Sequence, residues 1–325
     1  MKKVFFYTII FGLLVCSCKK KPKPDISPSS FDNGVLCMNE GLFQQNNATL
    51  SFYNNDSLKT QTTLFSSING RGLGDTANDM VMYYYLNELY IAIAVDVSSQ
   101  IEIINATTLK SIKQIPLFNG TTSRSPRHLE YFNHYLYAIN FDGTVSVIDL
   151  TSNSVIKNIN CGLNPDNSII IDNKLYVINS GGLNSPSYDN TITVIDLFSH
   201  TVIETFETAI NCSSVVKDTD NEIYLISRGN YADVAPSLLR LNSTSKIILQ
   251  TFDISIGSMT FFDNDLYYYD YDLKGIYKLD TQTESINHTQ LIDCGIFQNF
   301  YGIQIDNEKE LIYLIDANNY VTSST

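Results

Sequence analysis

Basic residues are scarce in this chain. Its 325 residues include 21 Lys and Arg against 34 Asp and Glu, so the formal net charge at neutral pH is −13. An acidic surface repels the phosphates of nucleic acids and has few cations with which to neutralise them. The composition therefore argues against a nucleic-acid partner.

The sequence also lacks the residue spacings of a metal site and of a catalytic triad. None of its cysteines forms a CxxC or CxxH spacing, which structural zinc sites use. Only four histidines occur, and no Ser/Asp arrangement can be paired with them. We therefore expect no enzymatic activity, no catalytic residues, no bound metal and no cofactor. A Cys161–Cys212 disulfide is possible, and buried free thiols at Cys37, Cys161, Cys212 and Cys294 are the alternative.

No apolar run near the N-terminus is long enough to span a membrane. Residues 4–15 are apolar after Lys2 and Lys3, but a spanning helix needs about 20 residues. The sequence Val15-Cys16-Ser17-Cys18 resembles a bacterial lipobox, which implies cleavage before Cys18 and lipidation of its thiol. An ordinary secretory signal with a chance cysteine is the alternative. We expect a lipoprotein signal peptide at 1–18, a disordered tether at 19–32 and a membrane anchor formed by lipid alone.

A sustained helical period is also missing, and short strand patterns recur instead. Residues 169–206 read as four strands separated by Asn, Asp, Gly and Ser clusters. A Leu/Ile-Tyr pair marks the second strand of each copy. The pairs are Leu89-Tyr90, Leu136-Tyr137, Leu175-Tyr176, Ile223-Tyr224, Leu266-Tyr267 and Ile312-Tyr313. Four strands in every 40–50 residues indicate an all-β, seven-bladed β-propeller of four-stranded antiparallel blades, formed by one domain at 33–325.

The two ends of the repeat array depart from this pattern. Residues 34–65 supply three strands, and the innermost strand is the missing one. Residues 301–306 and 311–316 supply the first two strands of a seventh unit. We therefore expect an incomplete last blade and a sequence that is truncated at its C-terminus. The alternative is that residues 321–325 form a stub and the ring closes imperfectly.

Three sequence features resemble one family of propellers. They are the Asn39-Glu40-Gly41 turn, the IDNKLYVIN strand of residues 171–179 and the IYLIDANNYVT segment of residues 312–322. Over residues 33–325 the chain is similar to the YncE-like, surface-layer-type propellers, and most similar to a lipoprotein branch whose domain has no assigned function. That resemblance implies an outer-membrane lipoprotein that captures cobalamin-type corrinoids for a TonB-dependent transporter. Lys19, Lys20 and Lys21 stand where surface-exported lipoproteins carry acidic residues, which leaves the face of the membrane open.

Function in a propeller concentrates on one mouth of its central channel, where rigid blades position long loops. Arginines, aromatic residues and amides gather in the loops expected there, and they suit a large, flat ligand with amide or phosphate groups, such as a corrinoid. The same side chains also suit a structural role, in which they bond backbone carbonyls of the long loops. The candidate ligand-binding residues are Asn39, Glu40, Phe43, Arg71, Arg124, Arg127, His128, Tyr188, Asn190, Arg228, Tyr231 and Tyr301.

Two other functions remain open at this stage. A propeller with a flat mouth and apolar loop tips serves as a protein-interaction or envelope scaffold without a small ligand. A metal-dependent lactonase is the third possibility, because Glu40, Asn179 and Asp316 occupy comparable blade positions and carry oxygen ligands. The favoured hypothesis is a lipid-anchored outer-membrane protein that captures a small molecule and passes it to a transporter.

Overall fold

The computed structural model describes residue 31 and residues 33–320. The expected signal peptide, the expected lipidation site at Cys18, the expected tether up to residue 30 and the expected C-terminal stub therefore lie outside the described residues. Within the part of the chain that is described, no helix is both long and apolar enough to cross a membrane.

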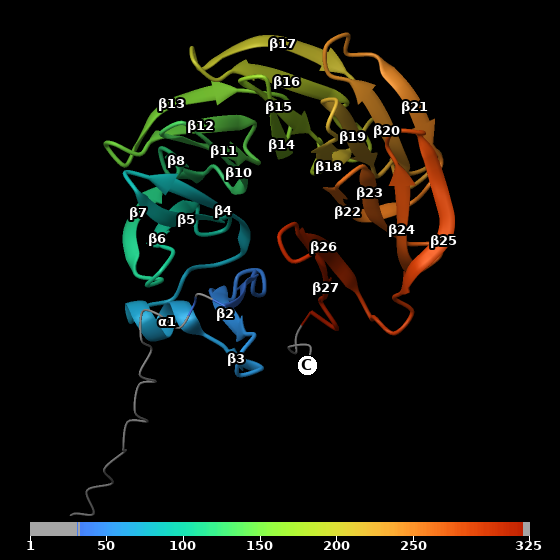
Figure 1. Ribbon diagram of the computed structural model, residues 1–325. Helices are drawn as coiled ribbons and strands as arrows, with labels where there is room; N and C mark the ends of the chain where they lie inside the picture. The colour runs from blue at the N-terminus through green and yellow to red at the C-terminus, as the bar shows by residue number, and fades with distance from the viewer. Residues whose placement is uncertain (1–30, 32, 321–325) are drawn as a thin grey trace, which may run out of the picture.

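Five four-stranded antiparallel sheets are arranged radially around a central channel (Figure 1). In each, the strands follow one another in chain order, with the first strand innermost and the fourth outermost. Short strands form because β-branched and aromatic residues alternate between turns. The innermost strands are β4 (Ala77–Tyr85), β10 (Pro126–Phe132), β14 (Pro165–Ile171), β18 (Cys212–Lys217) and β22 (Ile256–Phe262). The second strands are β5 (Glu88–Val95), β11 (Tyr135–Asn140), β15 (Lys174–Asn179), β19 (Glu222–Ser227) and β23 (Asp265–Asp270). The third are β6 (Gln100–Asn105), β12 (Thr144–Asp149), β16 (Thr191–Asp196), β20 (Ser237–Asn242) and β24 (Gly275–Asp280). The outermost are β7 (Ser111–Pro116), β13 (Ser154–Asn160), β17 (Thr201–Glu207), β21 (Ile248–Phe252) and β25 (Ser285–Asp293).

The ends of the array form smaller sheets. The N-terminal sheet has three strands, β1 (Gly34–Asn39), β2 (Thr49–Asn54) and β3 (Lys59–Gln61), followed by helix α1 (Leu64–Asn69). At the other end, β26 (Phe300–Asp306) and β27 (Leu311–Asp316) pair with each other in a hairpin. A further two-stranded sheet, β8 (Phe118–Asn119) with β9 (Thr122–Ser123), decorates the loop before β10.

The prediction of seven blades was wrong, because the described chain forms six blades. Five of them have four strands, and the N-terminal blade has three, without an innermost strand as expected. The segment taken for a seventh unit is only the β26–β27 hairpin, and no third strand joins it among the described residues. Two strands pair across a single interface, so the hairpin extends the array at β22 without forming a blade of its own.

Of the six repeated tyrosines, Tyr137, Tyr176 and Tyr224 are buried, whereas Tyr90, Tyr267 and Tyr313 are partly exposed. Tyr137 donates a hydrogen bond from its hydroxyl to the Leu197 carbonyl of the next blade, at 3.0 Å. Tyr176 does the same to the Ser243 carbonyl at 3.1 Å. These rings fill the spaces between blades, and each buried hydroxyl gains a partner there. The residues that close the third strands accept backbone hydrogen bonds within their own turns; they are Asn105, Asp149, Asp196, Asn242 and Asp280.

The innermost strand of each four-stranded blade, and β26 of the hairpin, has a β-bulge or register shift close to its start. The shift falls after Ala77 in β4, Pro126 in β10, Pro165 in β14, Cys212 in β18, Ile256 in β22 and Phe300 in β26. A bulge places one additional residue opposite a single residue of the partner strand and re-aims its side chain. The six bulges therefore present a set of unpaired residues at one end of the channel, which we call the mouth.

Candidate functional site

The mouth is built from two repeated backbone positions. One is the bulged residue of the innermost strand, which is Asn78 in β4, Arg127 in β10 and Asp166 in β14. The other is the residue directly after the second strand, whose amide bonds the carbonyl that precedes the innermost strand; Asp96 and Arg228 are examples. Both positions recur in each complete blade, so their side chains form a ring.

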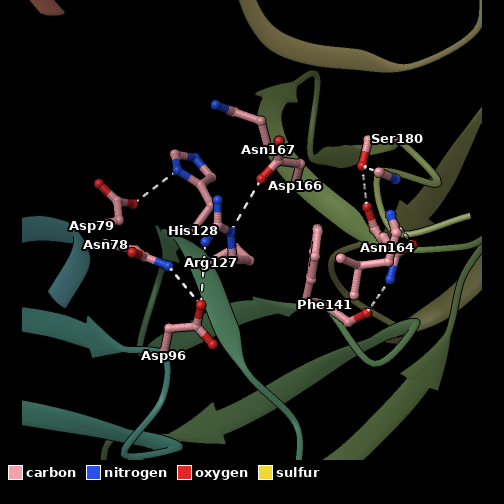
Figure 2. A network of polar contacts seen from close by, with 12 residues as sticks. Asn78, Asp79, Asp96, Arg127, His128, Phe141, Asn164, Asp166, Asn167 and Ser180 are labelled. Carbon is pink, nitrogen blue, oxygen red and sulfur yellow. Dashed lines mark hydrogen bonds and ion pairs between the residues drawn. The ribbon is translucent and has the colours of Figure 1, made fainter. Parts of the chain in front are cut away.

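Arg127 joins three blades at the mouth (Figure 2). Its Nη1 donates to Asp96 Oδ2 at 3.2 Å, and its Nε donates to Asp166 Oδ1 at 3.2 Å. Asn78 adds a hydrogen bond from its Nδ2 to the same Asp96 oxygen, also at 3.2 Å. On the far side of Asp166, Arg228 Nη1 lies 3.9 Å from Oδ2 and is half-exposed. We call these five residues, Asn78, Asp96, Arg127, Asp166 and Arg228, the mouth ring.

The charges of the mouth ring alternate around the channel. Asp96 and Asp166 lie on either side of Arg127, and Arg228 follows Asp166. Opposite charges beside the guanidinium outweigh its partial burial and raise the pKa of Arg127, so its charge is held permanently. The Nε and Nη1 groups of Arg127 thus donate to carboxylates, whereas Arg228 keeps most of its donors available to a ligand.

Aromatic side chains border the mouth ring. The guanidinium of Arg127 lies over the ring of Phe141, 5.1 Å from its centroid. Tyr271 follows the second strand β23, and its ring lies against Gly257. A Cβ atom at position 257 would lie only 2.7 Å from Cζ of the Tyr271 ring. Glycine at this bulge therefore makes room for the tyrosine ring. Farther out, Tyr188 and Tyr231 meet edge to face with centroids 6.3 Å apart. The mouth combines flat apolar faces with a few fixed polar groups, as small-molecule sites do.

One contact connects the two ends of the array. Tyr301, at the bulge of β26, donates a hydrogen bond from its hydroxyl to a Glu40 carboxylate oxygen. Glu40 directly follows β1, so this bond links the C-terminal hairpin to the N-terminal blade. The two residues were predicted as site residues from separate parts of the sequence, and the structure brings them together at the mouth.

His128 forms a partly buried clamp between β4 and β10. Its Nδ1 lies 2.8 Å from Asp79 Oδ2, and its Nε2 lies 3.7 Å from Glu130 Oε1. Burial disfavours the charged imidazole, but the two carboxylates outweigh it and raise the pKa of His128 to about 10. Burial also disfavours the Asp79 carboxylate, but His128 and the amides of Leu129 and Met80 hold its pKa below the usual value.

We expect the His128–Asp79 pair to make stability depend on pH in the alkaline range. His128 binds its proton more tightly when folded, so its contribution is complete below the unfolded pKa of about 6.5 and is lost as the pH rises through about 10. Denaturant unfolding of the native chain should lose roughly 2 kcal/mol between these values. His128→Gln should be less stable at pH 6 and should show a flatter profile. A native profile that is flat from pH 6.5 to 10 would refute this assignment.

Four of the other predicted residues make structural contacts. Arg71 binds the buried Glu102 carboxylate through Nη2 at 2.8 and 2.9 Å, on the face of β6 covered by α1. Arg124 is itself buried and donates to Asp142 at 2.8 Å. Asn39 donates to Ser51 Oγ at 2.8 Å, within the N-terminal blade. The carbonyl of Asn190 accepts the Thr208 amide. Phe43 is exposed at a loop tip.

A sequence profile of one protein family matches residues 33–324, and its description is "Domain of unknown function (DUF5074)". The chain belongs to the DUF5074 family. No curated protein matches the sequence. For this DUF5074 protein, likeness to known proteins beyond the family therefore comes from solved structures.

Solved structures similar to this DUF5074 protein support its fold. Hydrazine synthase from Kuenenia stuttgartiensis aligns over 94% of this chain and 99% of that chain, with 11% identity and a TM-score of 0.62. BamB from Moraxella catarrhalis aligns over 86% of this chain and 82% of that chain, with 10% identity and a TM-score of 0.57. The WD40 β-propeller domain of Doa1 aligns over 89% and 87%, with 12% identity and a TM-score of 0.60. Identities this low show the propeller fold alone.

The lactonase-type metal centre is not assembled in the described part of this DUF5074 protein. No group of three or more His, Cys, Asp or Glu side chains there is placed to hold a metal ion. Asn179 instead donates to Thr191 and Thr193 Oγ1, both at 3.0 Å. Asp316 accepts backbone amides at the start of β26 and after β27. The four cysteines of the described chain are free thiols, so the possible Cys161–Cys212 disulfide does not form.

Sequence reasoning missed several members of this DUF5074 site. Asn78, Asp96 and Asp166 were not singled out, although each contacts or neighbours a predicted residue. A signal for the bulge exists, because residues with positive φ precede the innermost strands at Thr76, Ser125, Asn164 and Asn211. In the sequence, however, these positions look like ordinary turn residues, and only the strand register shows that the second residue after each of them faces the mouth.

Proposed function

We propose that this protein is a lipid-anchored binding protein of the outer membrane, which captures a small molecule at the mouth and passes it to a TonB-dependent transporter. The observation that carries the proposal is the mouth ring, in which half-exposed Arg228 lies next to the fixed Arg127–Asp166 pair. A propeller is compatible with binding and scaffold roles alike, so the argument for a ligand rests on these side chains.

The ligand class follows from the chemistry of the mouth. Arg228 offers guanidinium donors to a phosphate or amide oxygen, whereas the Asp166 carboxylate accepts from an amide nitrogen. Phe141, Tyr271 and Tyr231 supply flat apolar faces around them. A large planar molecule with amides and a phosphate at its rim fits this combination, and a corrinoid is the ligand that we propose.

The anchor and the partner belong to the same proposal. The lipobox-like segment ending at Cys18 supports a lipid anchor, and the YncE-like resemblance supports the capture of a corrinoid for a transporter. Lipidation is tested by mass spectrometry of the N-terminal peptide from cells that express the native chain. An unmodified Cys18 would remove the anchor from the proposal while leaving the binding site untouched.

Calorimetric titration of cyanocobalamin into the detergent-solubilised full chain tests the ligand. We expect saturable binding, and we expect Arg228→Ala to weaken it about tenfold to a hundredfold, because a hydrogen bond from a charged group contributes about 1.5–3 kcal/mol. The stability of this variant should match that of the native chain, since the side chain is half-exposed.

Lys113→Ala provides the matched control, because Lys113 is an exposed cation on the outermost strand β7. It should bind cyanocobalamin as the native chain does. The absence of heat at micromolar protein would overturn the corrinoid, and equal effects of the two variants would overturn the site.

A protein-interaction role is the second candidate, and one observation favours it. The loops around the mouth expose apolar tips at Phe43, Leu183, Tyr231 and Ile296. Two hollows of about 450 and 210 Å³ lie among strand ends and turns at the end of the propeller opposite the mouth. If the protein binds a small molecule at the mouth ring, replacing both Leu183 and Ile296 by Ser should leave cyanocobalamin binding unchanged. Loss of transporter association in that variant, with no response to cyanocobalamin in the native chain, would favour the protein-interaction role.

A further inference from the structure

The outer rim of the propeller divides into a basic and an acidic arc. The outermost strands of the first three blades, β3, β7 and β13, contain Lys59, Lys113 and Lys157 and no acidic residue. Those of the next three blades, β17, β21 and β25, contain three acidic residues and no lysine or arginine. In a chain with a net charge of −13, the first three strands reverse the prevailing charge. We call β3, β7 and β13 the basic arc.

The lysines of the basic arc are available to a partner. All three are exposed, and so is Lys110 in the turn that leads into β7. In the described chain the lysine salt bridges are made by Lys278 and Lys309, so these four lysines have no carboxylate partner. Asp56 is the one acidic residue in the turns that lead into the three strands, and it accepts a hydrogen bond from Asn33. The positive charge of the arc is therefore not neutralised within the chain.

An exposed aliphatic side chain precedes each lysine of the basic arc. Leu58, Ile112 and Ile156 are 71%, 53% and 49% exposed. The bulges of β7 and β13 leave Ile112 and Ile156 without a pairing partner and turn them outward. Lysines beside exposed aliphatic groups are typical of surfaces that meet lipid, because the aliphatic group enters the apolar boundary while the ammonium group stays at the headgroups. This pairing favours a bilayer over a purely polar acidic partner.

The shape of the basic arc also favours a broad, flat partner. Its strands are the outermost of their blades and form the outer rim of the propeller (Figure 1). Neither of the hollows of about 450 and 210 Å³ is lined by a residue of these strands. The exposed lysines, together with the bulges of β7 and β13, discourage pairing with a further strand. The arc thus suits neither a peptide groove nor strand addition, whereas a bilayer needs only exposed cations and aliphatic groups.

The described chain enters the fold beside the basic arc. Phe31 packs edge to face on Phe52 of β2, with ring centroids 5.1 Å apart, and β2 pairs with β3. The acidic strand β17 and its neighbour β21 lie across the ring from this point (Figure 1). Residues 19–30 can reach at most about 40 Å from a lipidated Cys18. An anchor at Cys18 would therefore keep the N-terminal blade, and with it the basic arc, near the bilayer.

We propose that the basic arc docks on an anionic phospholipid surface, with its lysines at the headgroup phosphates and its aliphatic side chains at the edge of the acyl region. The inference rests on the proposed lipid anchor, because each lysine strengthens attachment only about fivefold. Charges farther apart than about 8 Å are screened at physiological ionic strength, so the acidic arc does not cancel the attraction. Contact through the rim lays the channel axis along the membrane plane, so the mouth would open toward a neighbouring membrane protein.

Lysine labelling on vesicles tests the docking surface. The lipidated full chain is reconstituted on phosphatidylcholine vesicles with or without phosphatidylglycerol and treated with a water-soluble acylating reagent, and mass spectrometry measures the labelling of each lysine. Phosphatidylglycerol should slow the labelling of Lys59, Lys110, Lys113 and Lys157 at least fivefold, because the bilayer then covers them. Lys274, an exposed lysine in the turn before β24, should be labelled at an unchanged rate.

Charge reversal on the rim provides the matched variants. Lys113→Glu with Lys157→Glu should abolish the protection of Lys59 and Lys110, because it makes the centre of the arc acidic. The unfolding free energy should stay that of the native chain, since both side chains are exposed. Lys274→Glu with Lys309→Glu makes the same change in charge outside the arc and should leave the protection intact.

Three results would overturn the proposal. One is equal labelling of the four lysines with and without phosphatidylglycerol in a chain that carries lipid on Cys18. Another is protection that needs no vesicles and grows with protein concentration, which would assign the arc to the acidic arc of a second copy. Protection on isolated cell membranes but not on phosphatidylglycerol vesicles would assign it to an acidic protein.

The proposed anchor and the basic arc can fail separately. The mass of the N-terminal peptide shows whether Cys18 is lipidated, and an unmodified Cys18 removes the anchor. The chain without lipid is then labelled with an excess of phosphatidylglycerol vesicles. Protection of the same four lysines would support the arc by itself, and its absence would overturn it. The cyanocobalamin titration in detergent depends on neither result.

Discussion

Replacing Arg71 by Ala is expected to destabilise the protein by about 3–5 kcal/mol. Glu102 is completely buried in β6, and Arg71 binds both of its carboxylate oxygens, with Ser111 and Gln114 as additional donors. Without the guanidinium the protein must keep a carboxylate charge in its interior that no cation compensates. Denaturant unfolding at pH 7 measures the loss as a shift of the transition midpoint.

The variant that combines Arg71→Ala with Glu102→Gln separates the buried charge from the lost packing. The neutral amide removes the charge that Arg71 compensates, so the double variant should be more stable than Arg71→Ala alone. Lys110→Ala, an exposed lysine in the turn before β7, should change stability little. A loss below about 1 kcal/mol for Arg71→Ala would show that Glu102 does not depend on this partner.

Arg127→Ala is expected to cost about 2–4 kcal/mol of unfolding free energy. Asp96 and Asp166 are largely buried and belong to the blades on either side of β10, so removing the guanidinium leaves two like charges facing each other across three blades. Denaturant unfolding at pH 7 measures the loss as a shift of the transition midpoint.

Arg127→Lys tests whether the bridge needs the planar guanidinium. A lysine keeps the charge but cannot point separate donors at two carboxylates in the same way, so its stability should fall between the native chain and Arg127→Ala. Asn78→Ala removes only one hydrogen bond to Asp96 and should cost less than either. A lysine variant as unstable as the alanine variant would show that the charge contributes nothing here.

The blades could be predicted because their determinants are local. Each Leu/Ile-Tyr pair marked a second strand, and the Asn or Asp after each third strand formed the expected turn. The number of blades could not be settled in the same way. The strands predicted at 301–306 and 311–316 do form. Whether a third strand pairs with them depends on residues elsewhere in the chain, and none of the described residues does so.

The candidate site was predicted only in part, because its partners are distant in sequence. Arg127 and Arg228 lie at the mouth as expected. Arg71 resembled them in its loop, yet 31 residues separate it from Glu102. The two meet because the α1 residues Leu64 and Phe65 pack in one core with Ile104 of β6. Asp166 was not predicted as a site residue, because an aspartate after a proline is typical of an ordinary turn. Only the bulge of β14 shows that its side chain faces the mouth.

Hydrogen exchange of the full chain with and without saturating cyanocobalamin tests the central claim most directly, since it locates the ligand as well as detecting it. The mouth account predicts slower exchange at residues 76–79, 125–128 and 164–167 and around Arg228, where the mouth ring is formed. Unchanged exchange in all of these segments, or protection confined to β1 and the opposite end of the channel, would contradict it.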